Sequence, residues 1–520
     1  MFFITRKLFK VIKVKTKLKS VKKYLLKTMK SMIILTSMEN IVSEESSPLL
    51  ITGKISLFTK LSYSLGHVFN DLAAAMWFSY TLLYLQRITK LEPLTAGALL
   101  LLGQLVDALM TPIFGILVDK YNKKKFWHII GSVLVALSFP VIFGNFLQNI
   151  KNNYISMIVY IVSIIIFQTG WAAVQISHLS MIPMLTNLPL VRAELTAIRY
   201  SAQVTAAVFL FIITWIVLPT NENSMIKLSD QDDIKFRNIV LIVTTCGVTA
   251  TILFHVSLKS HLLEHNQRNN VIDSPTTTDL SSKINDKKLS KNITKLNDLY
   301  DNNSSTISIT KTTTTTTTAT ATTTTKSSIG VKVLIRVALL YVASRLFITL
   351  ATVYLPLYIE ETDVGGKQAL ATVPLVSYIA SFISALTLKY INQSCGTKIC
   401  YLLGSLIGII GAAITKFGGN YEIIIYLIAI FIGIASSITM VTALSITADF
   451  IGIKTENSAL IYSIVTFLDK IITGLLVVFI EKWRCLDKES CLNYNRDTLA
   501  VVCCGSMILG LIALISLFRR

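Results

Sequence analysis

The chain has 520 residues, of which 52% are hydrophobic and only 15% are charged, and its net charge at pH 7 is +20. Soluble domains usually contain about 25% charged residues, so this composition excludes an ordinary soluble domain and indicates a membrane protein. The excess of Lys and Arg lies in short segments between apolar runs. A nucleic-acid-binding protein, which would gather basic residues on a folded domain, is therefore excluded, and the lipid bilayer is the expected partner.

Apolar segments long enough to cross a bilayer, which takes about 20 residues, recur along the chain. They predict an all-α polytopic membrane protein with twelve spanning helices in two six-helix halves. The predicted spans lie near 61–85, 94–118, 126–147, 154–183, 194–218, 238–258, 332–359, 368–391, 397–416, 421–448, 458–480 and 498–518.

The polar segments between these spans define the expected domains. They are a tail (1–56), a six-helix bundle (57–258), a linker (259–331), a second six-helix bundle (332–518) and a short tail (519–520). The linker is rich in Asn, Ser, Lys and Thr, a composition that buries too little apolar surface to fold, so we expect it to be disordered. The division suggests a duplication, since aligning the first spans of the two halves matches Tyr63 with Tyr341.

Basic residues fix the expected orientation. Lys and Arg are frequent before the first span, in 120–125, in the linker and at the end of the chain. Twelve spans place all these segments on one side, which the positive-inside rule makes cytosolic, so both termini are expected in the cytosol. The first thirty residues fit an amphipathic helix on an anionic membrane surface. The alternative is an over-extended start, because Met29, Met32 and Met38 also precede the first span.

Polar residues inside the spans predict a cavity. His67, Asn70 and Asp71 lie three and four positions apart in an apolar helix and share one face. Because an ionisable residue within the membrane is costly, it normally faces protein or water. We expect such residues to surround one cavity for a solute or a cation. The predicted cavity residues are His67, Asn70, Asp71, Gln104, Asp107, Gln175, His178, Arg199, Arg345, Asp469 and Lys470.

The third, sixth, ninth and twelfth spans have no ionisable residue in their middles. We therefore expect every third helix to face lipid while the others surround the cavity. Asp469 and Lys470 are adjacent and point about 100° apart on a helix. Lys470 is expected to face the cavity and Asp469 to support it.

A loop motif, GILVDKYNKKK, follows the second span at 115–125. A Gly allows close helix approach, an Asp at a helix end can receive a cation, and a basic run anchors the cytosolic face. The alternative is an ordinary basic loop. The spacing resembles the signature loop of the major facilitator superfamily, with Asn122 where that signature prefers Gly. The residues expected to act in gating are Gly115, Asp119, Lys120, Lys123, Lys124 and Lys125.

Further motifs narrow this resemblance. KLSYSLGHVFND and LLLLGQLVDALMTPIFG resemble the first two helices of the glycoside–pentoside–hexuronide:cation symporters. ITADFIGIKTENSALIYSIVTFLDK, GWAAVQISHLSMIPML and ELTAIRYS resemble the animal relatives of that branch. The motifs come from both halves and cover most of 55–518. The resemblance implies the twelve-helix major facilitator fold and secondary transport by alternating access.

The resemblance also implies roles for single residues. In the symporter branch, the counterparts of Asp71 and Arg199 bind substrate, and the counterpart of Asp107 binds the cation. A second acid of the cation site is replaced here by Thr111, and a substrate-site Asp by Gln175. The loss of two acids argues against sodium coupling and sugar binding, because a hard cation needs several oxygen ligands. The basic residue of the eleventh helix is retained as Lys470.

A cavity with both signs of charge suits a zwitterion better than a neutral sugar. The animal relatives are associated with movement of cysteine from the cytosol into lysosomes and melanosomes, so the resemblance implies cysteine or a related amino acid. His67 and His178 could bind a coupling proton, or they could be structural hydrogen-bonding residues. A carbohydrate:cation symporter and a non-transporting receptor or scaffold are the alternative functions.

No nucleophile–base constellation or metal-ligand spacing occurs, so we expect no enzyme activity, no catalytic residue, no metal and no cofactor. We also expect a monomer. In SEESSPLL, Glu45 followed by Leu49 and Leu50 resembles the acidic dileucine signal that clathrin adaptors read on endolysosomal cargo, although such motifs also arise by chance. The expected location is the lysosomal membrane. Cys485 and Cys491 lie on the predicted non-cytosolic side, as a local disulfide or as two free thiols.

Overall fold

The computed structural model describes residues 55–121, 123–144, 146, 153–186, 189–218, 228–229, 232–258, 331–362, 364–419, 421–451, 458–484 and 493–518. These residues belong to one compact unit of the chain, and every regular element among them is a helix. The N-terminal tail up to residue 54 and nearly all of the predicted linker lie outside the described residues.

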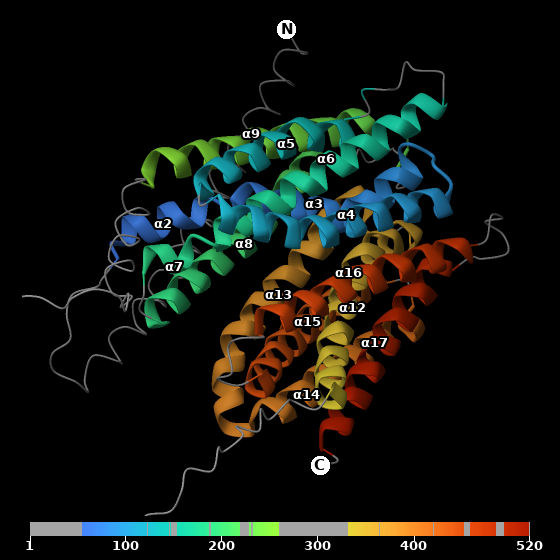
Figure 1. Ribbon diagram of the computed structural model, residues 1–520. Helices are drawn as coiled ribbons and strands as arrows, with labels where there is room; N and C mark the ends of the chain where they lie inside the picture. The colour runs from blue at the N-terminus through green and yellow to red at the C-terminus, as the bar shows by residue number, and fades with distance from the viewer. Residues whose placement is uncertain are drawn as a thin grey trace, which may run out of the picture. The chain divides into compact units, whose positions relative to one another are not determined.

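The first half contains the first six predicted spans (Figure 1). Two of these spans are broken. The first consists of α2 (Leu57–Leu65) and α3 (Val68–Arg87), and the fourth of α6 (Asn153–Leu179) and the short α7 (Ile182–Leu185). The other four spans are α4 (Pro93–Lys120), α5 (Lys124–Phe143), α8 (Pro189–Val217) and α9 (Asp233–Ser257).

The second half contains the other six predicted spans, each as one helix. They are α12 (Val331–Thr362), α13 (Gly366–Cys395), α14 (Thr397–Phe417), α15 (Glu422–Ile451), α16 (Ser458–Lys482) and α17 (Tyr494–Phe518). The twelve-span fold predicted from hydropathy is therefore confirmed for the described chain, with ends that differ by a few residues.

Local sequence explains several helix limits. The Ser56 hydroxyl accepts a hydrogen bond from the Thr59 amide (3.2 Å) and caps α2. Pro93 is the first residue of α4, a position where its missing N–H costs nothing. Gly396, with a φ of 81°, separates α13 from α14 in a left-handed conformation that favours glycine.

Ten of the described helices are long and apolar enough to cross a membrane. α3 and α16 are not among them, because polar residues interrupt their apolar sequences: Asn70 and Asp71 in α3, and Asp469, Lys470 and Glu481 in α16. Both helices pack within the same unit as the ten. These two spans thus carry four of the predicted cavity residues: Asn70, Asp71, Asp469 and Lys470.

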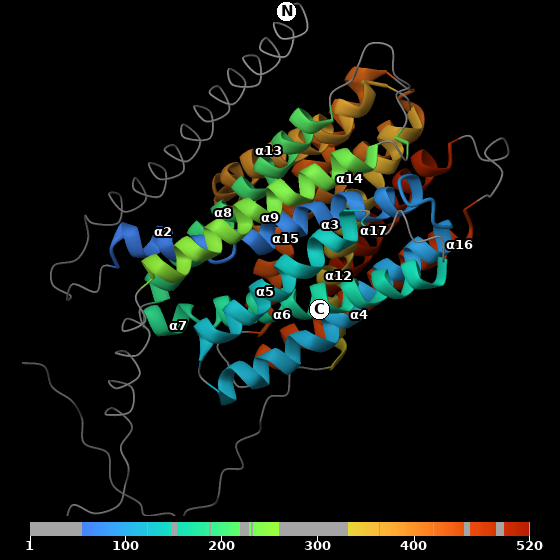
Figure 2. The ribbon, with the colours of Figure 1, turned by 90° about the horizontal axis from the view of Figure 1, so that it is seen from above.

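The two halves repeat one pattern of helix contacts (Figures 1 and 2). In the first half α5 packs on α6, α4 on α6, α3 on α9 and α5 on α9. The equivalent pairs of the second half, α14 with α15, α13 with α15, α12 with α17 and α14 with α17, are also in contact. Between the halves, α4 packs on α16 and α8 on α13, which are again equivalent pairs. This correspondence agrees with the predicted duplication.

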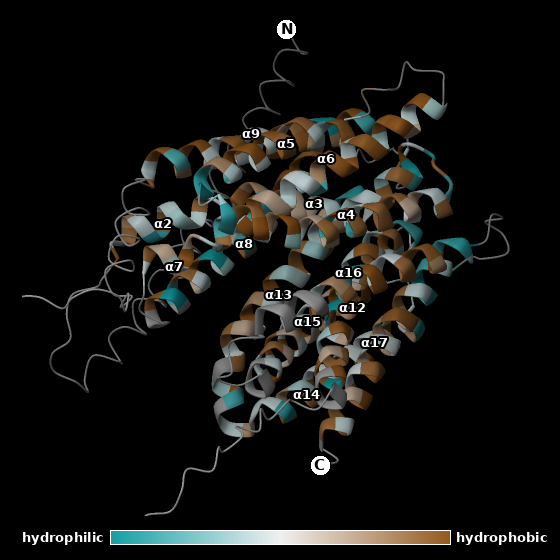
Figure 3. Cartoon of the chain, in the orientation of Figure 1, coloured by the Kyte–Doolittle hydropathy of each residue, from teal (hydrophilic) through white to brown (hydrophobic). Residues whose placement is uncertain are grey.

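Apolar residues make up long stretches of the helices (Figure 3), and many large apolar side chains are exposed. The expectation that every third helix alone faces lipid is wrong, because α6 and α13 also expose large apolar residues, for example Ile158 and Ile383. The helices that stand apart are α3 and α12. Among the described side chains, α3 exposes no large apolar residue and α12 exposes only Ile335. Both therefore lie in the interior, where polar side chains can face a solute.

The helices run alternately in opposite directions, so their ends gather at two levels. We name the level at which α3 ends at Arg87 and α12 ends at Thr362 the Arg87 end. The opposite level, at which α2 begins at Leu57, is the Leu57 end. By the basic-residue argument, the Leu57 end is the one expected to face the cytosol.

Candidate functional site

The first span is broken where its polar residues begin. The Gly66 amide donates to the Tyr63 carbonyl oxygen (3.1 Å) and the His67 amide to that of Ser64 (3.5 Å), so the spacing is three residues instead of the four of an α-helix. A Cβ atom on Gly66 would lie 2.7 Å from the His178 ring, so this approach requires glycine. Within a membrane, the backbone oxygens left at such a break must be satisfied by other groups.

Two histidines from other helices bond to oxygens at the break. His178 of α6 donates through Nε2 to the Tyr63 carbonyl oxygen (2.8 Å), and His128 of α5 donates through Nε2 to that of Gly66 (2.7 Å). The Tyr63 ring also stacks on His178, with centroids 4.2 Å apart. His178 therefore has a clear structural role, as the alternative interpretation of the sequence allowed.

Asp71, His67 and Arg199 form the centre of the site in the first half. His67 Nδ1 donates to Asp71 Oδ1 (2.8 Å). A guanidinium nitrogen of Arg199, on α8, lies 3.0 Å from His67 Nε2 and 4.0 Å from Asp71 Oδ1. The Asp71 side chain is only 2% exposed. The predicted common face thus holds for His67 and Asp71, whereas Asn70 turns toward α6 and donates to the Trp171 carbonyl oxygen (3.1 Å).

Several polar atoms at this centre have no hydrogen-bond partner within the described part of the chain. They are Asn70 Oδ1, Asp71 Oδ2, His178 Nδ1 and Arg199 Nε. Buried polar atoms are nearly always hydrogen-bonded in proteins, so these four can take a partner from outside the described chain. The group contains an anion, a cation and two acceptors.

A second charged pair joins the halves in the interior. Lys470 Nζ of α16 lies 2.7 Å from Asp107 Oδ2 of α4 and 3.3 Å from the Thr111 hydroxyl. Thr111 in turn donates to the Asp107 backbone oxygen (2.7 Å). The lysine ammonium therefore contacts both Asp107 and Thr111, the two positions at which the sequence resemblance had suggested a cation site.

A third charged pair lies within the second half. Arg345 Nε of α12 donates to Asp469 Oδ2 of α16 (3.1 Å), and Thr473 donates to the other carboxylate oxygen (3.4 Å). The Arg345 side chain is 32% exposed although α12 is buried along most of its length. The guanidinium is also close enough to Asp107 of the first half to interact with it electrostatically.

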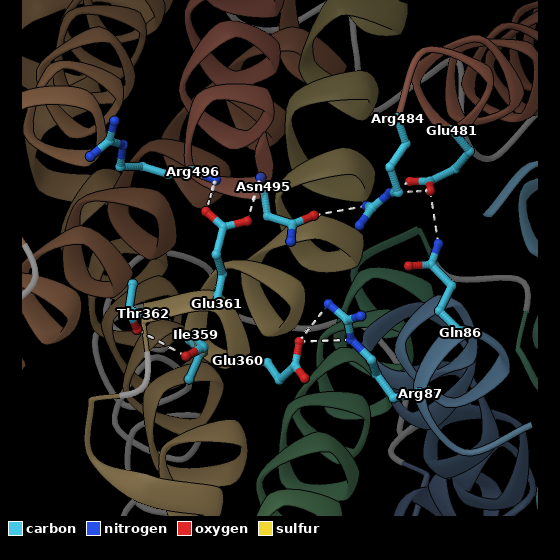
Figure 4. A network of polar contacts seen from close by, with 10 residues as sticks. All are labelled: Gln86, Arg87, Ile359, Glu360, Glu361, Thr362, Glu481, Arg484, Asn495 and Arg496. Carbon is cyan, nitrogen blue, oxygen red and sulfur yellow. Dashed lines mark hydrogen bonds and ion pairs between the residues drawn. The ribbon is translucent and has the colours of Figure 1, made fainter. Parts of the chain in front are cut away.

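Polar contacts close the Arg87 end (Figure 4). Arg87 of α3 pairs with Glu360 of α12 (2.7 Å), and Gln86 donates to Glu481 of α16 (2.8 Å). Glu481 is fully buried and also accepts from Arg484 (2.7 Å). A buried carboxylate with several donors is stabilised by them, so this network holds α3 against α12 and α16.

Asp232, which precedes α9, extends this closure. It accepts hydrogen bonds from Lys367 of α13 (2.6 Å), from Lys235 (2.7 Å) and from the Ser229 amide (3.0 Å). Burial by itself raises the pKa of Asp232, but the hydrogen bonds from the two lysines and from Ser229 outweigh it, so the pKa lies below its ordinary value. The Asp232 carboxylate therefore stays charged in mildly acidic solution and keeps its ion pair with Lys367.

The loop between α4 and α5 lies at the Leu57 end. Lys124 donates to the Ser180 carbonyl oxygen (2.9 Å), just after the C-terminal end of α6, and Lys125 donates to the Leu258 carbonyl oxygen, just after that of α9. Cations in these positions stabilise the C-terminal ends of helices. Asp119, Lys120 and Lys123 are exposed. Gly115 corrects an expectation, because a Cβ atom there would meet nothing within 4 Å. In this conformation no close helix approach requires it.

The remaining predicted residues lie either on α4 and α6 or outside the described chain. Gln175 accepts a hydrogen bond from the Trp171 indole (3.0 Å), and Gln104 is buried on α4 one turn before Asp107. Glu45, Leu49 and Leu50 lie outside the described residues, as do Cys485 and Cys491.

Sequence reasoning missed His128 and His255. They lie near the ends of the third and sixth spans, whose middles are apolar, so both spans were expected to face lipid. In the structure His128 is fully buried, and its Nδ1 lies 3.0 Å from His255 Nε2. The signal was available in the alternating direction of the spans, which places His67, His128, His178 and His255 toward the same side of the membrane.

Together, the helical fold and its interior charged groups are those of a polytopic secondary transporter. A family described as MFS/sugar transport protein matches residues 62–280. The chain is 32% identical to the human (Homo sapiens) major facilitator superfamily domain-containing protein 12 over 460 residues, which cover 84% of this chain and 87% of that protein. The chain therefore belongs to the major facilitator superfamily, in the family of domain-containing protein 12.

Solved structures agree on the fold. A crystal structure of a D-xylose–proton symporter matches with a TM-score of 0.60 at 11% identity, over 89% of this chain and 97% of that chain. The inward-open conformation of the xylose transporter XylE from E. coli matches with a TM-score of 0.57 at 11% identity, over 88% and 95% of the two chains. At such low identity these similarities concern the fold alone.

Proposed function

We propose that the protein carries cysteine, or a closely related small amino acid, from the cytosol into lysosomes or related organelles by alternating access. The observation that carries this proposal is the group of unpartnered atoms around Asp71 and Arg199. An α-amino acid holds an ammonium and a carboxylate on one carbon. A buried carboxylate with a free oxygen, 4.0 Å from a guanidinium, offers complementary charges at a matching separation.

Binding would follow from this geometry. The solute ammonium pairs with Asp71 Oδ2, while the solute carboxylate takes hydrogen bonds from Arg199. Arg345, whose side chain is partly exposed, would supply a second cation from the opposite half. A solute that bridges the halves in this way favours the movement that closes them around it, because only the closed arrangement uses both cations.

The contacts between the halves support a state that is open toward the cytosol. At the Arg87 end the halves are joined by Arg87 with Glu360, by Gln86 with Glu481 and by Lys367 with Asp232. Farther toward the Leu57 end, the halves are also joined by the contacts of Lys470 with Asp107 and Thr111. If the Leu57 end is cytosolic, the solute would enter from the cytosol in this arrangement.

A carbohydrate:cation symporter is the second candidate, because the matching family is described as sugar transport proteins. The site argues against it. Lys470 places an ammonium 2.7 Å from Asp107, and Thr111 replaces a second acid, so a sodium ion would find few free oxygen ligands there. A neutral sugar would also leave the charges of Asp71 and Arg199 unmatched.

The test uses the full chain, purified and placed in liposomes loaded with unlabelled solute. Exchange of labelled cysteine should be saturable and resistant to competition by disaccharides, with or without sodium. Cystine, tested in parallel, measures the selectivity for the thiol. Sodium-dependent exchange of a labelled sugar, without cysteine exchange, would replace this proposal with the second candidate. Absence of flux for every solute would favour a receptor or scaffold.

A further inference from the structure

One of the contacts between the halves involves the backbone itself. The Tyr80 hydroxyl of α3, in the first half, donates a hydrogen bond to the Leu370 carbonyl oxygen of α13, in the second half (2.9 Å). Both residues are buried, with exposed fractions of 0% and 2%. In a regular α-helix the Leu370 oxygen would instead accept from the amide of the residue four positions later.

The residue four positions after Leu370 is Pro374, which has no N–H. The α-helical donor to the Leu370 oxygen is therefore missing from α13. Because a buried backbone oxygen without a partner is destabilising, this oxygen needs a donor from elsewhere. Tyr80 supplies that donor from the other half, so the proline of one half and the tyrosine of the other act on the same oxygen.

The Tyr80 ring is held in place by the first half. It makes edge contacts with Phe211 of α8 and Phe236 of α9, and in both pairs the ring centroids are 6.1 Å apart. The Tyr80 hydroxyl also hydrogen-bonds to the side chain of Thr214, on α8. If the halves separate, the tyrosine therefore keeps a partner in its own half, whereas the Leu370 oxygen loses Tyr80 and must be satisfied by water.

This contact lies among others that join the start of α13 to the first half. Just before it on α13, Lys367 pairs with Asp232 (2.6 Å), and Gln368 accepts a hydrogen bond from the Trp215 indole (3.3 Å). All three contacts are near the level at which α3 ends and α13 begins. Separation of the halves at this level would break them together and admit water to the freed backbone oxygen.

We propose that the Tyr80–Leu370 hydrogen bond is a latch that is made only while the Arg87 end is closed, and that Pro374 keeps its acceptor free. With this end closed, Tyr80 satisfies the oxygen, and with this end open, water does. Exchange of one partner for the other has a small net free energy, so the latch favours closure without preventing opening. The inference rests on the alternating access of the proposed function but not on its solute.

A double-mutant cycle tests the latch. Tyr80→Phe keeps the ring but removes the donor, and Pro374→Ala restores the N–H that would satisfy the Leu370 oxygen within α13. If the latch exists, Tyr80→Phe has its effect only while residue 374 is proline. A proline that serves only to shape α13 predicts independent effects. Tyr358→Phe, on α12, is the matched control, because the buried Tyr358 hydroxyl has no hydrogen-bond partner within the described chain.

Hydrogen–deuterium exchange of the full chain in lipid nanodiscs, followed by mass spectrometry without added solute, measures which end is open. The backbone amides of 88–97 report on the Arg87 end, and those of 57–66 report on the Leu57 end. In alternating access one end closes as the other opens, so exchange at the two ends changes in opposite directions. A substitution that only destabilises the protein raises exchange at both ends.

In the wild-type background, Tyr80→Phe should raise exchange at 88–97 by roughly three- to tenfold and lower it at 57–66. With Pro374→Ala present, Tyr80→Phe should change exchange at either end by less than about 1.5-fold, as should Tyr358→Phe in the wild-type background. Pro374→Ser, which also carries a backbone N–H, replaces Pro374→Ala if the latter fails to fold. If Tyr80→Phe alone fails to fold, addition of Pro374→Ala should restore the folded protein.

Four outcomes overturn the latch: no change with Tyr80→Phe, the same change in both backgrounds, a rise in exchange at both ends, or an equal change with Tyr358→Phe. Absence of cysteine exchange in liposomes counts instead against the proposed solute, because the hydrogen–deuterium measurements need no solute.

Discussion

Lys470 of α16 and Asp107 of α4 form an ion pair, with Nζ 2.7 Å from Oδ2, that joins the two halves in the interior. The neighbouring residue, Asp469, makes its ion pair with Arg345 inside the second half. The two adjacent side chains therefore stabilise different contacts. A substitution of Lys470 removes an ion pair between the halves, whereas a substitution of Asp469 removes an ion pair within the second half.

Charge reversal should distinguish these two contacts. Lys470→Glu places a second acid beside Asp107, and we expect cysteine exchange in liposomes to fall by more than about tenfold, because an uncompensated buried charge costs about 3–5 kcal/mol. Asp469→Lys should mainly lower the melting temperature of the purified protein. The double variant Asp107→Lys, Lys470→Asp should recover part of the exchange. Equal effects of the two reversals on both measurements would contradict this assignment.

Asp71→Asn should abolish exchange while the expression level stays near wild type. The substitution keeps the side-chain volume but removes the charge beside His67 and Arg199 that would bind the solute ammonium. Ser79→Ala, on the same helix and equally buried, is the control and should leave exchange unchanged. Wild-type flux in Asp71→Asn would remove this carboxylate from the solute site.

Asp232→Asn should destabilise the protein by about 3 kcal/mol, because it leaves the buried Lys367 ammonium without its counter-ion. Since the pKa of Asp232 is lowered in the folded protein, the ion pair contributes its full stability above the ordinary pKa of about 4 and loses it as the pH falls further. The difference in melting temperature from wild type should thus be constant from neutral pH to about 5 and shrink below about 4.

Lys235→Gln provides the comparison for this pH profile. Lys235 is the less buried of the two lysine partners of Asp232, so its loss should have a smaller effect. A stability difference for Asp232→Asn that already shrinks between neutral pH and about 5 would mean that the pKa is raised, contrary to the geometry.

Gly433→Ala should lower the stability of the second half. A Cβ atom there would overlap the Ser377 carbonyl oxygen of α13, and a backbone atom cannot rotate away, so we expect a loss of about 1–3 kcal/mol. Gly505→Ala, on α17, meets nothing within 4 Å and should be neutral or slightly stabilising. Thermal unfolding of the purified variants measures both, and similar melting temperatures would contradict the close packing of α15 on α13.

Leu49→Ala together with Leu50→Ala should move tagged protein from lysosomes to the cell surface. If this segment is a sorting signal, the two adjacent leucines would fill an apolar pocket of a clathrin adaptor while the acid at Glu45 meets a basic patch. Fluorescence microscopy with lysosomal and surface markers measures the shift, and Ser46→Ala with Ser47→Ala is the control. Full colocalisation of the leucine variant with lysosomal markers would show that another signal places the protein.

Sequence alone determined the membrane class, the number of spans and the position of most charged residues. These follow from local physics, because each span must be about 20 apolar residues long and each interior charge must face protein or water whatever the neighbouring helix is. It also placed His67 and Asp71 on one face, since positions four apart are neighbours on any helix.

Tertiary structure decided which charges meet. The spacing along one helix gives a direction but not the helix that lies there, so the pairs of Lys470 with Asp107 and of Arg345 with Asp469 could not be assigned from sequence. The break at Gly66 was hidden as well, because a glycine in an apolar run is compatible with a continuous helix until His128 and His178 supply donors for its backbone oxygens. Residues far apart in the chain meet only through packing, and that packing brings His128 and His178 to the backbone oxygens of Gly66 and Tyr63.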